Sequence, residues 1–182
     1  MIKGFIGLPR SGKSTLLAKY AKKGFKKYDK VYSNFYIKGC YQLDFDDLGV
    51  HLYENALILI DEIALFCDSR NWKNFSKELV YFFTNHGHYK LDIIWCSQSM
   101  DADKKIRNMT EELYYIKNFG FGISTIQKIE KGFDFNSDVK DCYTVSGFPK
   151  ILYRKPYYNM FDSYVKRPLP PNTAKKWSDL DA

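Results

Sequence analysis

Residues 7–15, which read GLPRSGKST, constrain this chain more than any other stretch of its sequence. They match G-x-x-x-x-G-K-[ST], the glycine-rich loop that wraps around nucleotide phosphates. Gly7 and Gly12 allow a tight turn and a close approach to the phosphates, because neither carries a Cβ atom. The backbone N–H groups of residues 9–14 then form a nest for an anion, which the start of the next helix completes.

The side chains of this loop predict a nucleotide site that includes a divalent cation. Lys13 places a point charge at the β- and γ-phosphates, and the Ser14 hydroxyl is the expected ligand of Mg²⁺. An apolar segment at 2–6 and a helical pattern at 15–20 supply the strand and helix that the motif requires on either side. We therefore expect ATP and Mg²⁺ as cofactors, with a chance glycine turn before a basic helix as the alternative. The expected cofactor-binding residues are Gly7, Pro9, Arg10, Ser11, Gly12, Lys13, Ser14 and Thr15.

A second chemical signal follows the apolar run at 56–60. A continuous apolar run predicts a strand buried on both faces, as in the centre of a parallel sheet. Asp61 and Glu62 stand at its carboxyl end, where open α/β sheets bind their ligands. We predict that Asp61 joins Ser14 in binding the metal, directly or through water, and that Glu62 is the general base for the attacking water. A pair of helix-capping carboxylates is the alternative, and the phosphate loop favours the catalytic interpretation.

The remaining pattern predicts an α/β fold, a P-loop NTPase with a central, mainly parallel sheet flanked by helices. A strand at 91–98 ends in Gln98, which is expected to face the γ-phosphate as a sensor, or else to bond only backbone. From about residue 123 short alternating runs predict a β-rich C-terminal extension; these runs lie at 124–131, 141–145 and 150–158. We expect an ATPase domain over 1–165, with a core at about 1–122 and the extension at about 123–165. A proline-containing segment at 166–182 is predicted to be a mobile tail or linker.

Composition limits the possible partners without choosing among them. Lys and Arg number 28 against 21 Asp and Glu, giving a net charge of +7 that suits nucleic acid, nucleotide or an acidic membrane surface. The 4 cysteines lie far apart, which argues against a zinc site or a disulfide framework. His86 and His88 lack partners at metal-ligand spacing, so we assign them to a helix end and turn. No segment approaches the ~18–20 apolar residues of a membrane-spanning helix.

Several segments resemble the zonula-occludens-toxin-like family, which includes the assembly ATPase of filamentous phages and is placed with the FtsK/HerA-type P-loop motors. The segments are LIDE at 59–62, DSRNW at 68–72, FFTNHGH at 82–88, LDII at 91–94 before Gln98, and YNMFDS at 158–163. The last is similar to a segment that closes the family's ATPase domain. The likeness covers roughly residues 1–165.

This resemblance implies roles that the residues alone leave open. Arg70 matches the arginine that follows the family's Asp-Glu motif, and it would reach the γ-phosphate of a neighbouring subunit in a homo-oligomeric ring. Arg70 and the sensor Gln98 join Lys13 and Glu62 as the expected catalytic residues. Arg10 stands where family members often carry glycine. The family usually continues into a transmembrane helix and a periplasmic part, so we expect membrane contact only through partners or a missing region.

The expected function is a phage-type ATPase motor that hydrolyses ATP to drive virion assembly or extrusion, or DNA translocation. Its expected partners are phage DNA or virion assembly proteins, in the host cytoplasm at the inner face of the cell membrane. Two alternatives stay open: an ATPase that packages DNA into a preformed capsid, and a nucleotide-gated binding protein with little turnover. A small-molecule nucleoside kinase shares the loop, but the Asp-Glu pair favours activation of water over transfer to a substrate.

Overall fold

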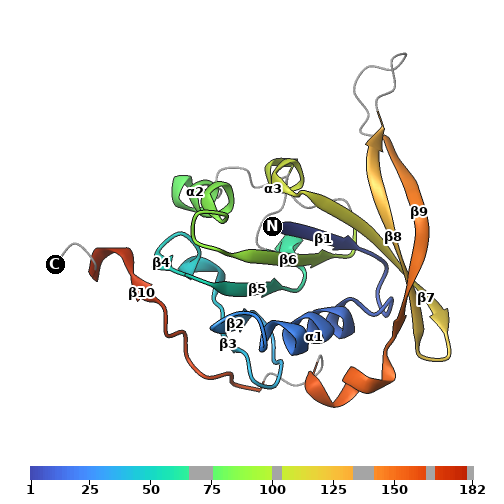
Figure 1. The fold of residues 1–182 in the computed structure, drawn as a ribbon, viewed down its shortest axis with the longest axis horizontal. Helices are drawn as coiled ribbons and strands as arrows, with labels where there is room; N and C mark the ends of the chain where they lie inside the picture. Colours follow the sequence, from blue (N-terminus) through green and yellow to red (C-terminus); the bar gives the residue numbers. More distant parts are fainter. Residues whose placement is uncertain (66–75, 100–103, 133–141, 163–166, 180–182) are drawn as a thin grey trace.

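A central sheet organises the computed structural model, which describes residues 1–65, 76–99, 104–132, 142–162 and 167–179 (Figure 1). Its strands are β1 (Ile2–Ile6), β2 (Lys30–Ser33), β3 (Tyr41–Gln42), β5 (Ala56–Ile60), β6 (Asp92–Ser97), β7 (Glu112–Gly120), β8 (Ile123–Gly132) and β9 (Cys142–Tyr153). They form an 8-stranded sheet in the order β3-β2-β5-β6-β1-β7-β8-β9. Pairing is parallel from β3 to β7, whereas β8 is antiparallel to both β7 and β9. The predicted α/β class with a mainly parallel sheet is confirmed.

Helices cover both faces of the parallel part of the sheet. The helices are α1 (Lys13–Gly24), α2 (Lys77–Asn85) and α3 (Lys104–Met109), with short 3₁₀ turns η1 (Phe45–Asp47), η2 (Ile63–Leu65), η4 (Lys155–Met160) and η5 (Trp177–Asp179). Figure 1 shows α1 on one side of the sheet and α2 and α3 on the other. Side chains of β5 alternate between the two cores: Leu57 and Leu59 pack with α1, and Ile58 and Ile60 pack with α2 and α3. This two-sided burial explains why the run at 56–60 is apolar throughout.

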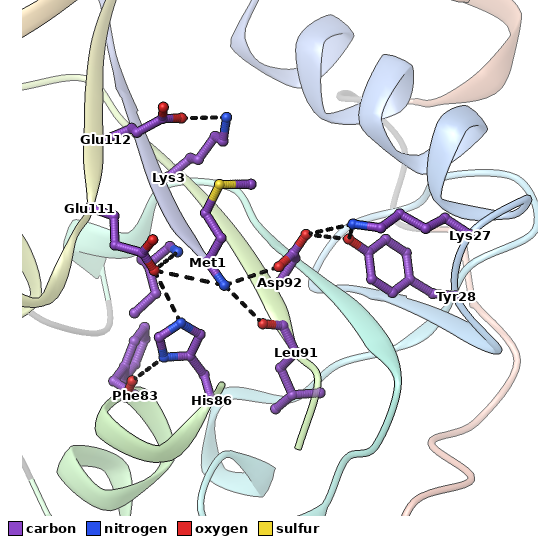
Figure 2. Close-up of polar contacts among 11 residues, drawn as sticks. Met1, Lys3, Lys27, Tyr28, Phe83, His86, Leu91, Asp92, Glu111 and Glu112 are labelled. Atoms are coloured by element: carbon purple, nitrogen blue, oxygen red, sulfur yellow. Dashed lines mark hydrogen bonds and ion pairs between the residues drawn. The ribbon is translucent and has the colours of Figure 1, made fainter. Parts of the chain in front are cut away.

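The amino ends of the central strands are joined by a polar network around the chain terminus (Figure 2). The amine of Met1 lies 3.0 Å from Asp92 Oδ1 and 3.7 Å from Glu111 Oε1, which ties β1 to β6 and to the start of β7. His86 follows α2, and its Nε2 lies 3.2 Å from the same Glu111 oxygen. Among the described residues, no cluster of His, Cys, Asp or Glu has the makings of a metal site. The contacts of Met1, Asp92, Glu111 and His86 tie together the end of the sheet opposite to the phosphate loop.

The C-terminal part differs from prediction in two places. The runs expected at 141–145 and 150–158 form one strand, β9, which ends at Tyr153, and the 3₁₀ turn η4 follows it. Pro156 stands in the first turn of η4, where a helical turn does not need its missing N–H.

The prediction of a mobile tail or linker is wrong for residues 167–179, because this segment packs on the domain. Leu169 is buried against the α1 core, and the carbonyl of Pro170 accepts a 2.7 Å hydrogen bond from the Gln42 amide. Further on, β10 (Lys175–Lys176) pairs with β4 (His51–Leu52) in a 2-stranded sheet. Prolines exclude a helix here, but they leave the carbonyl groups free to accept hydrogen bonds from a neighbouring segment.

Candidate nucleotide-binding site

The predicted phosphate loop connects β1 to α1 and is crowded by strands from the C-terminal half. A Cβ atom at Gly7 would lie 2.3 Å from the Ile116 carbonyl oxygen, and one at Gly12 would lie 2.8 Å from Ser124 Oγ. Gly12 has a φ of 103° and Arg10 a φ of 63°, both in the left-handed region that favours glycine. A glycine at the position of Arg10 would adopt this backbone without strain. The close approach of β7 and β8 therefore leaves no room for a side chain at Gly7 or Gly12, whether or not a phosphate is bound.

Lys13 is folded back onto the loop that carries it. Its side chain is buried, and Nζ donates hydrogen bonds to the carbonyl oxygens of Gly7 at 2.7 Å and Leu8 at 3.2 Å. A buried ammonium group needs such acceptors, because an unpaired one is costly to bury. The charge is thus held at the loop, where phosphate oxygens can take the place of the two carbonyls.

Ser14 and Asp61 meet although they come from different elements. Ser14 Oγ, in the first turn of α1, donates a 2.7 Å hydrogen bond to Oδ2 of Asp61, directly after β5. Asn34 holds the backbone of Asp61 through two 2.8 Å hydrogen bonds, one to its carbonyl and one from its amide. Burial raises the pKa of Asp61, opposed by the Ser14 hydrogen bond and the charge of Lys13. The hydroxyl and carboxylate oxygens are ligand types that Mg²⁺ prefers.

Glu62 is directed toward the carboxyl end of the neighbouring strand β6. Its Oε1 accepts hydrogen bonds from the backbone amide of Gln98 at 3.1 Å and from Ser97 Oγ at 3.4 Å. A φ of 53° at Glu62 is rare for a residue with a side chain, and such strain concentrates at functional sites. The structure thus brings Gln98 to Glu62 through its main chain. Because the Gln98 side chain is exposed, its predicted role as a sensor stays a prediction.

A cavity of about 610 Å³ opens beside the loop. Its volume lies within the ~300–1,000 Å³ typical of small-molecule sites. It is lined by Arg10, Gly12, Lys13, Ser14, Thr15, Arg154, Tyr158, Phe161 and Asp162. The first five of these belong to the loop and the start of α1, and the other four come from the chain after β9. One side of the cavity is therefore formed by a segment that is distant in sequence from the loop.

Three residues that support the site lack any local sequence signal. Asn34 positions Asp61, as described above. Ser124 Oγ donates a buried 2.6 Å hydrogen bond to the Ser11 carbonyl. Arg154 donates to the Arg10 carbonyl at 3.2 Å and to Asn118 Oδ1 at 2.8 Å, and its Nε has no partner among the described residues. The family resemblance at 158–163 indicated the segment that includes Tyr158, Phe161 and Asp162 but assigned these residues no role.

Two further predictions concern Arg70 and membrane-spanning helices. Arg70, the predicted finger, lies at 66–75, outside the described residues, so its role stays a prediction. Within the described part of the chain, every helix is too short or too polar to cross a membrane.

Comparisons with known proteins identify the family of this chain and support its fold. The family model described as zonular occludens toxin (Zot) matches residues 41–167, more than half of the chain. The N-terminal domain of zonular occludens toxin from Neisseria meningitidis superimposes with a TM-score of 0.55 at 18% identity, covering 88% of this chain and 98% of that one. The genome packaging NTPase B204 of Sulfolobus turreted icosahedral virus 2, in complex with ATP-gammaS, gives 0.51 at 11% identity over 80% and 96%. No curated protein sequence matches the chain. At these identities the structures show a shared P-loop NTPase fold, as predicted.

Proposed function

The chain belongs to the zonular occludens toxin family, and from this premise we propose that it is a magnesium-dependent ATPase that drives phage virion assembly or extrusion, or DNA translocation. The observation that carries the proposal is the contact between Ser14 and Asp61. It sets a hydroxyl and a carboxylate next to the phosphate-binding Lys13, in the arrangement that P-loop NTPases use for the metal and the triphosphate.

The residues present fit both ATP and Mg²⁺. The cavity beside the loop, at about 610 Å³, lies against Gly12, Lys13, Ser14 and Thr15, where a triphosphate would bind. Ser11 Oγ is buried and has no hydrogen-bond partner among the described residues, so the loop retains an unsatisfied polar group. Ser14 and Asp61 would hold Mg²⁺, which supplies positive charge against the phosphate oxygens.

The side chains divide the work of hydrolysis between binding and proton transfer. Lys13 exchanges its two carbonyl acceptors for phosphate oxygens and stabilises the negative charge there. Glu62 accepts a proton from the attacking water as the water oxygen bonds to the γ-phosphorus. The bond from that phosphorus to the bridging oxygen breaks, and ADP leaves with the electron pair. The hydrogen bonds from Gln98 and Ser97 orient the Glu62 carboxylate for this proton transfer.

An ATPase assay with the wild-type protein and Lys13→Ala tests the proposal. We expect magnesium-dependent turnover in the wild type, and weak nucleotide binding without turnover in a folded Lys13→Ala variant. Wild-type turnover by the folded variant would overturn the assignment. Tight ATP binding by the wild type with negligible turnover would instead favour a nucleotide-gated binding protein.

The polymer that the motor moves is addressed by adding double- or single-stranded DNA to the same assay. The basic net charge of +7 supports an anionic partner. Stimulation by DNA without any membrane supports DNA translocation, including packaging into a preformed capsid, and a requirement for virion assembly proteins supports extrusion. Mass measurement with ATP present tests the homo-oligomeric ring, for which we propose the host cytoplasm as the location.

A further inference from the structure

The cavity beside the phosphate loop has an outer wall that phosphate binding does not need. This wall consists of Tyr158, Phe161 and Asp162, which lie in and just after η4. The opposite wall consists of the loop and the first turn of α1. A triphosphate on the loop would therefore leave the space next to η4 for the rest of the nucleotide.

The outer wall is held in place by the segment after β2. Ile37 and Phe161 form an antiparallel bridge, and the Lys38 amide donates a 2.7 Å hydrogen bond to the carbonyl of Met160. The ring of Phe161 packs edge-on against Phe35, with the ring centroids 6.4 Å apart. The wall is thus a fixed part of the fold, which lowers the entropic cost of binding a ligand against it.

The wall offers an aromatic ring and a carboxylate in an otherwise cationic cavity. Tyr158 lines the cavity and is 47% exposed, so its ring remains accessible to a ligand. Aromatic rings of this kind stack on nucleobases, each of which has a π-face. A carboxylate repels phosphates but accepts hydrogen bonds from hydroxyl groups. Asp162 therefore suits the sugar end of a nucleotide, whereas Arg10, Lys13 and Arg154 suit its phosphates.

We propose that this wall is a nucleoside site, in which the base stacks on Tyr158, with Phe161 beside it, and the ribose hydroxyls donate to Asp162. The inference rests on the proposed function, because it requires a triphosphate on the loop. It identifies the substrate as a ribonucleoside triphosphate that is recognised at both ends. Stacking on Tyr158 binds the base without choosing among bases, because each of them has a π-face.

Comparing ATP with inorganic tripolyphosphate separates the two ends of the site. We expect Tyr158→Ala to weaken ATP binding about five-fold or more, the range measured for loss of a stacking ring, while tripolyphosphate binding stays unchanged. Tyr158→Phe should retain ATP binding, because it keeps the ring. Tyr153→Ala is the matched control, since it removes an exposed tyrosine that lies outside the cavity.

The outcomes distinguish this inference from the function beneath it. Wild-type affinity for ATP in Tyr158→Ala, or an equal loss of ATP and tripolyphosphate affinity, overturns the nucleoside site while leaving the ATPase proposal intact. A wild-type protein that binds neither ATP nor tripolyphosphate overturns the proposed function itself, and the nucleoside site with it.

The ribose contact has its own test, with 2′,3′-dideoxy-ATP as the probe. We expect wild-type protein to bind ATP more tightly than the dideoxy analogue, and Asp162→Asn to reduce that preference by weakening ATP binding alone. Arg167 Nε lies 3.5 Å from Asp162 Oδ2, so Arg167→Gln controls for the loss of this ion pair. An equal preference in the wild type and Asp162→Asn overturns the role of Asp162.

Discussion

The hydroxyl of Ser14 donates a 2.7 Å hydrogen bond to the carboxylate of Asp61, which joins the start of α1 to the end of β5. The bond supports the charged form of a carboxyl group whose pKa burial raises. A buried carboxylate of this kind is stabilised further by a bound cation. The same contact thus links the geometry of the loop to the stability of the fold, and it involves both residues that we propose as ligands of Mg²⁺.

Asp61→Asn should change how stability depends on pH. Because its pKa is raised in the folded protein, Asp61 binds its proton more tightly there than in the unfolded chain. Its contribution to the free energy of unfolding is fully present below the ordinary carboxyl pKa and is lost as pH rises through the raised value. Without Mg²⁺ and nucleotide, we expect Asp61→Asn to gain stability relative to the wild type as pH rises through this window. Urea denaturation at a series of pH values measures the difference, with the exposed Asp46→Asn as control. A difference that does not vary with pH would contradict the prediction.

Glu62→Gln should bind ATP but lose turnover by about 10²–10⁴-fold, the usual contribution of a general base. The amide keeps the volume of the side chain and an oxygen that can accept from Gln98 and Ser97, but it cannot take the proton. Nucleotide titration and steady-state hydrolysis separate the two effects. Asp61→Asn is the comparison variant, because it should differ from Glu62→Gln by weakening the dependence of hydrolysis on Mg²⁺. A normal rate in Glu62→Gln would show that another group activates the water.

Gly12→Ala should destabilise the protein more than Gly120→Ala does. Both glycines have left-handed φ values, 103° and 94°, so both variants carry similar backbone strain. Only at Gly12 would the new Cβ meet close neighbours, at 2.8 Å from Ser124 Oγ and 2.9 Å from Arg154 Cδ, whereas nothing lies within 4 Å at Gly120. We expect an additional loss of about 1–3 kcal/mol in the free energy of unfolding, the usual cost of overpacking. Urea denaturation of the two variants measures it, and equal losses would refute the crowding.

Arg70→Ala should abolish turnover if this arginine acts across a subunit boundary, since an arginine finger contributes about 10³–10⁵-fold in rate. A mixture of inactive Arg70→Ala and inactive Lys13→Ala proteins should then recover part of the activity. Mixed rings contain some interfaces with an intact loop on one side and an intact arginine on the other. Recovery should rise with protein concentration as rings form. Absence of recovery in demonstrated mixed oligomers would exclude a finger in trans.

The phosphate loop and the strand before Asp61 could be predicted because their chemistry is local. Glycine spacing sets what the backbone of the loop can do, and a continuous apolar run at 56–60 is sufficient to indicate a strand covered on both faces. The order of β5, β6 and β1 in the sheet brings the main chain of Gln98 next to Glu62.

Tertiary structure alone decided which distant residues complete the site. Ser124 contacts a loop residue 113 positions earlier, and Arg154 contacts one 144 positions earlier. The docking of residues 167–179 likewise depends on the edge strand β3 and on the core under α1, which no pattern in that segment describes. Such contacts have no signature in either partner, because a serine, an arginine or a proline-rich stretch is usual on a surface. The free energy that holds Ser124 and Arg154 at the loop comes from packing of β7, β8 and β9 in sequence next to β1. This packing exists only once the sheet has formed.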